Sequence, residues 1–421
     1  MMYRISHPTK ILKGSITLSS SKSESNRALI IQALCKDKFE IKNLSTSEDT
    51  IILQKILNAN NVSAIDEITF DVGAAGTTMR FLTAFFATKP GTYILTGSQR
   101  MKKRPIGILV EALRQLGADI EYLEKEGFPP LQINGKHLNG GEVEIDGNIS
   151  SQFISALLLI SPEFKNGLVI KFKGEVTSRP YIDMTLKMMQ EFRVYGIWQD
   201  GIISVSQQNY YKKSDLDYFY KVEADWSSAS YWYSMATLAK ETDLIIKGLK
   251  KPSLQGDAMV ADMFTFFGIK SEFIEEGIRL TKTSLKEEHF GFDFSDCPDL
   301  VQTIAVVISA LGISGFFNGL LTLKIKETDR ISALQNELMK LGVKVEIEND
   351  NCMKLTPPEM LNHPKIINTY DDHRMAMAFA ALAMVFDSIV IEEPDVVKKS
   401  YRNFWLDLKH LGFQIEEVSE E

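Results

Sequence analysis

The sequence has few of the features that mark membrane proteins and secreted proteins. Its longest weakly polar run, MAMAFAALAMVF at residues 375–386, is shorter than the roughly 20 residues that a membrane-spanning helix needs. The first ten residues, MMYRISHPTK, lack the apolar core of a secretory signal. Three cysteines without close spacing (Cys35, Cys297 and Cys352) form neither a disulfide framework nor a zinc site. We therefore expect a cytoplasmic protein with no membrane partner and no metal.

The sequence also lacks an excess of basic residues. It has 47 Lys and Arg against 55 Asp and Glu, which gives a formal net charge of -8. A general nucleic-acid-binding protein would show a basic footprint, so we expect no nucleic-acid partner. Any basic cluster in such an acidic chain is expected to be local and functional. The 421 residues, 44% of them hydrophobic, are enough for two domains of about 200 residues each.

A pattern that is present recurs six times: a polar opening rich in Ser, Thr or Asp, followed by a strongly apolar helix. Chance recurrence of amphipathic helices in an α/β protein is the alternative explanation. The openings lie 54 to 77 residues apart, close to the fixed period that marks internal repeats. They are marked by Ser23, Thr77, Ser151, Ser228, Asp299 and Asp372.

A second helix follows in each repeat and is expected to end at a glycine, which can take the left-handed conformation after a last helical turn. Short β-branched strands such as EVEIDG, LVIKFKG and DLIIKG separate the helices. Six repeats of about 70 residues without capping repeats favour two domains of three repeats over an open solenoid. The expected helix ends are Asn60, Gly117, Gly196, Gly268, Gly342 and Gly412.

The helix openings carry groups that bind anions. A helix N-terminus exposes unpaired N–H groups and a partial positive charge, so Ser, Thr or Gly beside Lys or Arg makes an anion site. The stretch SKSESNR places Lys22, Ser23 and Arg27 on one first turn, and Arg104 precedes Pro105, which we place in the first turn of a helix. Further openings are expected at TSRPYID, KIKETDR, DDHR and VKKS. Each opening alone is more simply a helix cap. Six or seven such helix openings in one acidic chain are not so easily explained by capping, and they favour binding of polyanionic substrates.

Two carboxylates occupy openings of the same kind. Asp299 precedes LVQTIAVVISAL, and Glu327 lies in KIKETDR between Lys326 and Arg330. If the openings converge, cations and carboxylates share one site that is suited to proton transfer on anionic substrates. Capping is the alternative role for each carboxylate.

An ordered set of motifs from Lys22 to about Lys399 resembles the 5-enolpyruvylshikimate-3-phosphate (EPSP) synthase family. This resemblance implies an α/β fold of two domains, each of three βαβαββ units (an inside-out α/β barrel, the enolpyruvyl transferase fold), around a closing cleft. The motifs are SKSESNRALI, GAAGTTMRFL, RMKKRPIG, SSQFISALL, TSRPYIDMT, ADWSSASY, LQGD, KIKETDR and YDDHRMAMA.

The resemblance implies transfer of the enolpyruvyl group of phosphoenolpyruvate to the 5-hydroxyl of shikimate 3-phosphate in aromatic amino acid biosynthesis, with release of phosphate, no cofactor and no metal. It makes Asp299 the group that activates the hydroxyl and Glu327, with Lys22, the acid/base at the enolpyruvyl carbon. The implied shikimate 3-phosphate contacts are Ser23, Arg27, Ser150, Ser151, Ser178, Tyr181, Asp299 and Lys326. The implied phosphoenolpyruvate contacts are Lys22, Gly76, Arg104, Gln152, Arg330, Arg374 and Lys399.

Further expectations accompany the resemblance. The domains are expected to be residues 1–18 with 226–421, and residues 19–225, in a monomer. Gly76 implies that the protein is a glyphosate target. The chain departs from the family pattern at Ala74, where Asn is common, and at Thr322, where one branch has Asn.

Two other functions remain open. A sister transferase moves enolpyruvate to UDP-N-acetylglucosamine in cell-wall synthesis, but it usually carries a cysteine in the loop that reads QRMKKRPIG here, and an Asn where Ser23 follows Lys22. A non-catalytic paralogue that only binds anions is the other alternative. The joint presence of Lys22, Asp299 and Glu327 is evidence against it.

Overall fold

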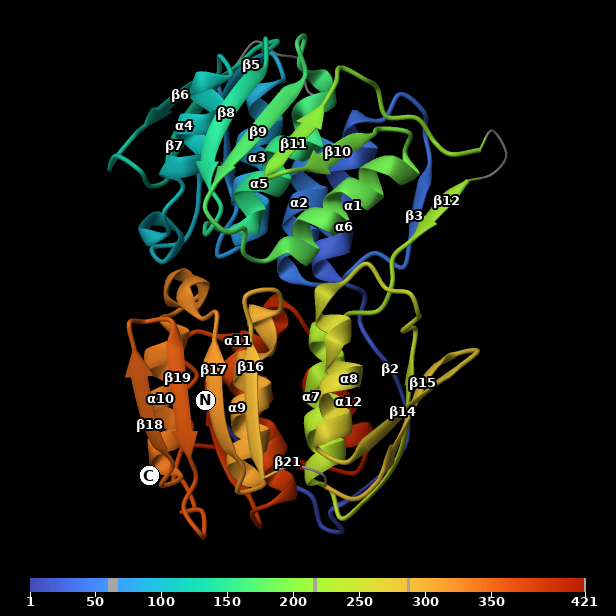
Figure 1. Cartoon of the computed structure of the whole chain (residues 1–421), viewed down its shortest axis with the longest axis vertical. Coiled ribbons are helices and arrows are strands. Elements are labelled where there is room, and N and C mark those ends of the chain that lie inside the picture. The colour runs from blue at the N-terminus through green and yellow to red at the C-terminus, as the bar shows by residue number, and fades with distance from the viewer. Residues whose placement is uncertain (60–66, 215–217, 286–287, 420–421) are drawn as a thin grey trace. The chain divides into compact units, whose positions relative to one another are not determined.

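The computed structural model describes residues 1–59, 67–214, 218–285 and 288–419 (Figure 1). The chain forms two compact units. Unit 1 consists of Met1–Ser20 and Glu223–Glu421, and unit 2 is Ser21–Val222. Unit 2 is therefore inserted into unit 1 along the chain. The domain limits expected from the sequence, near residues 18 and 225, stay a prediction, because compactness does not show that either part folds independently.

One topology recurs in both units: two parallel strands, each followed by a helix, and then an antiparallel pair of strands that returns beside the second strand. In unit 2 it gives the sheet order β4-β5-β7-β6 and, in the next repeat, β8-β9-β11-β10. The elements are β4 Ile68–Asp71, α3 Gly76–Ala87, β5 Gly91–Thr96, α4 Gly107–Gln115, β6 Asp119–Tyr122, β7 Leu131–Gly135, β8 Gly141–Asp146, α5 Ser151–Ile160, β9 Leu168–Lys173, α6 Arg179–Glu191, β10 Gly196–Gln199 and β11 Ile202–Val205.

Unit 1 contains the same order twice, as β16-β17-β19-β18 and β2-β13-β15-β14. In the second of these sheets, all of unit 2 lies in sequence between β2 and α7. The elements are β2 Ile11–Thr17, α7 Trp226–Leu238, β13 Glu241–Lys247, α8 Val260–Phe266, β14 Ile269–Ile274, β15 Gly277–Lys282, β16 His289–Asp293, α9 Val301–Ala310, β17 Ser314–Asn318, α10 Arg330–Lys340, β18 Lys344–Glu348 and β19 Cys352–Thr356.

In the remaining repeat of each unit, distant parts of the chain supply the strands. The N-terminal strand β1 pairs antiparallel with both β20 and β21, and Ile367 forms a single parallel bridge to Ile391. In unit 2, β12 pairs parallel with β3. The elements are β1 Met2–Ser6, α1 Lys22–Leu34, β3 Glu40–Lys42, α2 Glu48–Ala59, β12 Phe219–Lys221, α11 His373–Ala380, β20 Ile389–Glu392, α12 Phe404–His410 and β21 Gln414–Val418.

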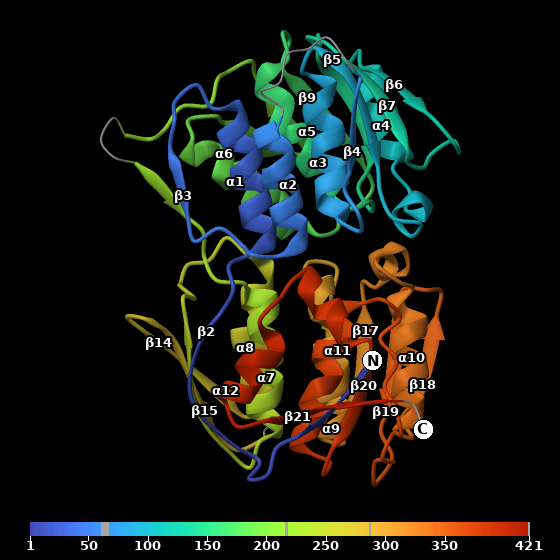
Figure 2. The ribbon, with the colours of Figure 1, turned by 180° about the vertical axis from the view of Figure 1, so that it is seen from behind.

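The helices form the buried layer of each unit. All 12 residues of α3 are buried, as are nine of the ten in α5. In unit 2, α1 packs on α2, α2 on α3, α3 on α5, α5 on α6 and α6 on α1 (Figure 2). The strands alternate instead, as in β8, where Val143 and Ile145 are buried between exposed glutamates and an aspartate. This arrangement places the sheets outside the helices, because each strand has only one apolar face to bury.

Four of the expected helix ends are glycines with positive φ, at 101°, 78°, 86° and 92°; they are Gly117, Gly268, Gly342 and Gly412. The prediction at Gly196 is wrong. Helix α6 ends at Glu191, the left-handed position is taken by Arg193 with φ 65°, and Gly196 begins β10. Asn60 lies outside the described residues. Among those residues, the helices are all too short or too polar to cross a bilayer.

Candidate active site

In unit 2 the predicted residues lie at the starts of helices. Ser21 caps α1 by accepting a hydrogen bond from the Glu24 amide at 3.4 Å, so Lys22 and Ser23 stand in the first turn. Ser150 caps α5 in the same way through the Gln152 amide, at 3.4 Å, and Ser151 is the first helical residue. These caps leave the remaining first-turn amides directed along the helix axis, which is the arrangement that binds anions.

Arg27 is the most deeply embedded of the predicted residues in unit 2. Its guanidinium donates to Thr185 Oγ1 at 2.7 Å, Ser155 Oγ at 2.8 Å, Ser23 O at 2.8 Å and Tyr181 O at 3.2 Å. All four acceptors are uncharged. Burial lowers the pKa of Arg27 to about 10, so it remains a cation at neutral pH. A buried cation held by neutral oxygens keeps its charge available to a bound anion.

Helix α6 brings Tyr181 to Arg27, and Ser178 directly precedes the same helix. Ser178 precedes the helix in the left-handed conformation, with φ 55°, and is 3% exposed. The carbonyl oxygen of Tyr181 accepts both from Arg27 and, at 2.8 Å, from Thr185 Oγ1. The predicted shikimate 3-phosphate residues Ser23, Arg27 and Tyr181 are therefore joined by hydrogen bonds that involve two backbone carbonyls.

Gly76, at the start of α3, lies against two buried arginines. Its carbonyl accepts from Arg80 Nη1 at 2.8 Å. A Cβ atom at this position would stand 2.6 Å from Arg80 Nη1 and 2.8 Å from Arg104 Cζ, with Arg104 Nη1 closer still. A side chain here would force the two guanidinium groups to move, so the glycine matters for space rather than for its backbone angle. Lys22 lies 3.8 Å from the buried carboxylate of Asp49.

Two local expectations are wrong. Pro105 does not lie in a first helical turn, because α4 begins at Gly107 and Arg104 ends a short 3-10 helix at Met101–Lys103. The segment VKKS does not open a helix either. Lys399 is the last residue of a 3-10 helix at Pro394–Lys399, and α12 begins only at Phe404.

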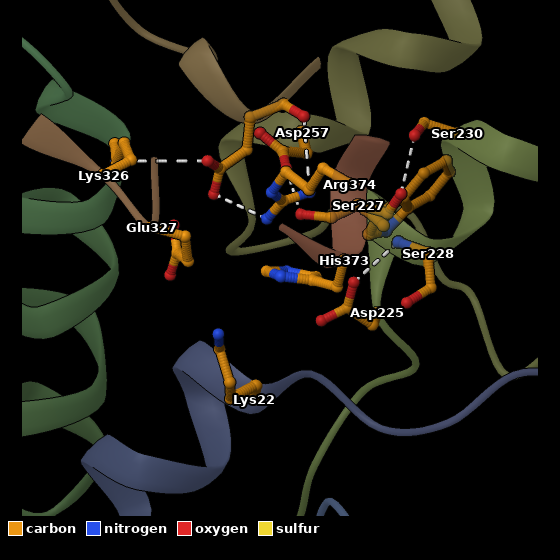
Figure 3. A network of polar contacts seen from close by, with 12 residues as sticks. Lys22, Asp225, Ser227, Ser228, Ser230, Asp257, Lys326, Glu327, His373 and Arg374 are labelled. Atoms are coloured by element: carbon orange, nitrogen blue, oxygen red, sulfur yellow. Dashed lines mark hydrogen bonds and ion pairs between the residues drawn. The ribbon is translucent and has the colours of Figure 1, made fainter. Parts of the chain in front are cut away.

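In unit 1 the predicted residues form one network of charges around Asp299. Its carboxylate accepts from Arg330 Nη1 at 2.9 Å and from Arg374 Nη2 at 2.7 Å, and Lys326 Nζ lies 4.0 Å away. Figure 3 labels Lys326, Glu327 and Arg374 of this network. Asp299 belongs to the 3-10 turn Pro298–Leu300 that leads into α9. Its side chain binds the arginines instead of capping the helix, so the capping alternative is wrong for this residue.

Arg330 connects the second predicted carboxylate to the same network. Its Nη2 donates to Glu327 Oε2 at 2.9 Å, and its Nε donates to Asp372 Oδ2 at 2.7 Å. Glu327 also pairs with Lys399, at 2.8 Å. Asp372 in turn caps α11 by accepting from the Arg374 amide at 2.9 Å. Three helix starts, those of α9, α10 and α11, thus meet at one cluster.

The cluster sets the ionisation of its members. Burial alone would raise the pKa of Asp299, but Arg374, Lys326 and Arg330 outweigh it and hold that pKa well below its usual range. Burial lowers the pKa of Lys326, and Asp299 offsets only part of this effect. Burial would also lower the pKa of Arg330, but Asp372, Glu327 and Asp299 raise it instead. Asp299 is therefore ionised in the structure.

Asp257 is a site residue that the sequence did not single out. It lies in a 3-10 helix at Gly256–Met259, is 2% exposed and accepts a short hydrogen bond from Ser227 Oγ (Figure 3). Burial, reinforced by the negative charge of Asp299 and opposed by Arg374, raises the pKa of Asp257 to about 7. The motif LQGD contains it, but only the fold shows that its carboxyl group is buried near Asp299.

The two departures from the family pattern differ in environment. Ala74 is exposed, next to Gly73, whose φ is 56°. Thr322 is 7% exposed, within a 3-10 helix at Leu321–Ile325. In the part of the chain that the structure describes, no three His, Cys, Asp or Glu residues are grouped so that they could hold a metal ion.

The family model for EPSP synthase (3-phosphoshikimate 1-carboxyvinyltransferase) matches residues 6–66 and 55–408. The chain belongs to the EPSP synthase family. A curated relative from Bacteroides fragilis (strain ATCC 25285), named 3-phosphoshikimate 1-carboxyvinyltransferase, is 47% identical over 423 residues, with 100% of each chain covered. A relative of the same name from Sulfurovum sp. (strain NBC37-1) is 38% identical, covering 96% of this chain and 98% of that protein.

Solved structures of lower identity share the fold. The EPSP synthase from Acinetobacter baumannii aligns with a TM-score of 0.76 at 18% identity, covering 100% of both chains. The enolpyruvyl transferase NikO from Streptomyces tendae aligns with a TM-score of 0.75 at 12% identity, covering 100% of this chain and 99% of that one. The predicted enolpyruvyl transferase fold is thereby confirmed. The assignment of individual site residues stays a prediction.

Proposed function

We propose that this protein transfers the enolpyruvyl group of phosphoenolpyruvate to the 5-hydroxyl of shikimate 3-phosphate and releases phosphate. The observation that carries the proposal is the cluster of unit 1. It places two carboxylates, Asp299 and Glu327, on one arginine, Arg330, in a chain of the EPSP synthase family. The reaction requires a proton to be removed from a hydroxyl and another to be delivered to a methylene carbon, so a base and an acid must act together.

In this proposal the arginines regulate the basicity of Asp299. A carboxylate that accepts from Arg330 and Arg374 and has a strongly depressed pKa is a poor base. Phosphoenolpyruvate brings a phosphate and a carboxylate, which guanidinium groups bind in a forked geometry. When these anions bind Arg330 and Arg374, they neutralise part of the positive charge that holds the pKa of Asp299 low. That pKa then rises, and the Asp299 carboxylate becomes a better base for the 5-hydroxyl proton.

Glu327 is proposed as the acid/base at the enolpyruvyl carbon, together with Lys22. It is held between Arg330 and Lys399 at 2.9 and 2.8 Å, and therefore lies between two cations assigned to phosphoenolpyruvate. The remaining proposed phosphoenolpyruvate residues are Gly76, Arg104, Gln152 and Arg374. The proposed shikimate 3-phosphate residues are Ser23, Arg27, Ser150, Ser151, Ser178, Tyr181, Asp299 and Lys326.

Turnover by the purified protein tests the proposal. The protein is mixed with shikimate 3-phosphate and phosphoenolpyruvate after extensive treatment with a chelator, and released phosphate and the mass of the product are measured. We expect one phosphate for each enolpyruvyl product. A parallel reaction with UDP-N-acetylglucosamine should give no product. Turnover of the UDP-sugar alone would assign the chain to the cell-wall reaction, and binding of shikimate 3-phosphate without turnover would identify a paralogue that only binds anions.

A further inference from the structure

The segment that delivers Asp372 and Arg374 to the cluster has a strained backbone. Tyr370 and Asp371, directly before Asp372, both have positive φ, at 55° and 57°. Neither is a glycine, and Tyr370 is the more strained of the two, because a bulky residue rarely adopts positive φ, whereas Asp does so more readily. Such a conformation persists only where surrounding contacts determine it. The contacts that hold this turn therefore also determine where Asp372 and Arg374 lie.

Glu337 of α10 supplies the central contacts. Its side chain is fully buried. Its Oε1 accepts from the Tyr370 hydroxyl at 2.8 Å, and its Oε2 accepts from the backbone N–H of Asn368 at 3.0 Å. The Glu337 carboxylate thus holds the strained turn through the side chain of Tyr370 and the segment before it through the backbone of Asn368. The burial of Tyr370 and its bond to Glu337 raise the pKa of the phenol to about 12, so it remains a donor at neutral pH.

Lys340, one turn further along α10, completes the set of contacts. Its ammonium donates to Glu337 Oε2 at 2.7 Å, to Ile366 O at 3.0 Å and to Asn368 Oδ1 at 2.5 Å. The side-chain amide of Asn368 donates from Nδ2 to Glu392 Oε2 at 2.6 Å. The buried negative charge of Glu337 is therefore compensated by a cation that also binds the same segment of backbone.

Helix α10 holds this segment at both ends. Arg330 in its first turn binds Asp372, and Glu337 binds Tyr370 and Asn368. Residues 330 and 337 are seven apart, so they lie on the same face of the helix, two turns from each other. A shift of residues 366–372 along α10 would break both sets of bonds at once.

We propose that Glu337, acting with Lys340 through Tyr370 and Asn368, is a positioning residue for the phosphoenolpyruvate-binding side of the cluster. Glu337 fixes the left-handed turn, and this turn places Arg374 where it binds Asp299 and Asp372 where it binds Arg330. The inference rests on the proposed function and deepens it, because it names a group outside the substrate contacts that sets the affinity for one substrate.

The test compares two variants that each remove one tyrosine hydroxyl in unit 1. Tyr370→Phe removes the bond to Glu337. Tyr233→Phe removes a bond of 2.9 Å to Ser271 Oγ, between α7 and β14, which does not involve the cluster. Both variants should lower the melting temperature. Only Tyr370→Phe should raise the KM for phosphoenolpyruvate. We expect an increase of up to about tenfold, because a hydrogen bond to a charged group stabilises a fold by roughly this factor and only that much can be lost at the site. The KM for shikimate 3-phosphate should change less than twofold.

Two further variants probe the mechanism. Lys340→Gln removes the ammonium from Ile366 and Asn368 and should raise the same KM by a smaller factor. Asp371→Gly makes the left-handed angle inexpensive, so in the Tyr370→Phe background it should restore part of the lost affinity. If Asp371→Gly restores none, the strained turn is not what transmits the effect.

Equal KM values for phosphoenolpyruvate in Tyr370→Phe and Tyr233→Phe would overturn the inference. This outcome is distinct from failure of the proposed function, because the unaltered protein serves as the reference. If the unaltered protein does not turn over both substrates, the proposed function fails first. If it does and the two tyrosine variants match, only the positioning role of Glu337 is wrong.

Discussion

Two arginines of this chain, one in each unit, are buried to a similar degree but differ in their hydrogen-bond acceptors, which are neutral for one and charged for the other. Arg27 is 2% exposed and donates to hydroxyl and carbonyl oxygens, whereas Arg330 is 1% exposed and donates to three carboxylates. Burial lowers the pKa of Arg27, and carboxylates overcome burial to raise that of Arg330. An anion arriving at Arg27 meets a guanidinium that is hydrogen-bonded to neutral oxygens, whereas an anion arriving at Arg330 must compete with three carboxylates.

This difference suggests a division of labour. The neutral surroundings of Arg27 suit binding of a substrate phosphate with little rearrangement. The carboxylate-rich surroundings of Arg330 suit chemistry, since the competition between substrate anions and Asp299 changes the proton affinity of the carboxylate. Variants of Arg27 should therefore affect the affinity for shikimate 3-phosphate, and variants of the carboxylates Asp299 and Glu327 should affect rate.

Asp299→Asn should have the largest effect. The amide can still accept a hydrogen bond but cannot act as a base, so kcat should fall by roughly 10²- to 10⁴-fold. The melting temperature should also fall, because two buried arginines lose their shared counter-charge. The control is Asp329→Asn, since Asp329 caps α10 through the Ser332 amide at 3.2 Å and Asn caps equally well. Steady-state kinetics that give wild-type kcat for Asp299→Asn would remove Asp299 from the chemistry.

Arg27→Lys should have the next largest effect, on binding. A lysine ammonium cannot reach Thr185, Ser155 and the Tyr181 carbonyl together as the forked guanidinium does. We expect the Kd for shikimate 3-phosphate, measured by calorimetry, to rise by about 10- to 100-fold. Arg114→Lys, at a partly exposed pair with Glu111, serves as the control and should leave the Kd unchanged. A larger loss in kcat than in affinity would contradict the proposed division between the units.

Gly76→Ala should have a more moderate effect, on phosphoenolpyruvate. The added methyl would force Arg104 and Arg80 to move, because its Cβ would lie within 3 Å of both guanidinium groups. We expect the KM for phosphoenolpyruvate to rise by about tenfold with little change in kcat, and glyphosate to inhibit the variant less well than the unaltered protein. Gly291→Ala is the control, since its nearest neighbour would be Phe316 O at 3.8 Å. Equal inhibition of the two glycine variants would refute the steric argument.

Asp257→Asn should have the smallest effect, on the pH dependence of stability. The folded pKa of about 7 lies above the ordinary value of 3.8, so the protonated carboxyl group stabilises the fold at low pH. That contribution is lost as the pH rises from about 4 to about 7 and does not change further above it. Melting temperatures between pH 5 and pH 8.5 should therefore fall by a few degrees in the unaltered protein. The Asn variant should show a smaller fall, and identical slopes would show that Asp257 does not titrate in this range.

The sequence predicted the helix starts well because their signals are local. Ser21, Ser150, Asp225 and Asp372 each accept from an amide of the first helical turn, as cap residues do. The apolar stretches that follow are the buried helices of the structure. The fold class could be predicted from the repeat of these local signals together with the resemblance.

Other features depend on contacts between distant residues and could not be predicted. The left-handed turn after α6 falls on Arg193 instead of a glycine, and Lys399 ends a 3-10 helix instead of opening an α-helix. Asp257 and Glu337 have no local signal, because their roles arise from burial beside Asp299 and Tyr370. The sequence could name the carboxylates, but not which arginine each one binds.

The pairing of β1 with β20 and β21 has a consequence for synthesis on the ribosome. Residues 2–6 are made long before their partners at residues 389–392 and 414–418. At typical rates of 5–20 residues per second, the N-terminal strand remains unpaired for roughly 20 to 80 s. The described strands of unit 2, at residues 21–222, pair with one another within that continuous stretch and do not wait for the C-terminal strands. During translation both backbone edges of MYRIS thus lack their strand partners, and a chaperone or a neighbouring nascent chain could pair with them.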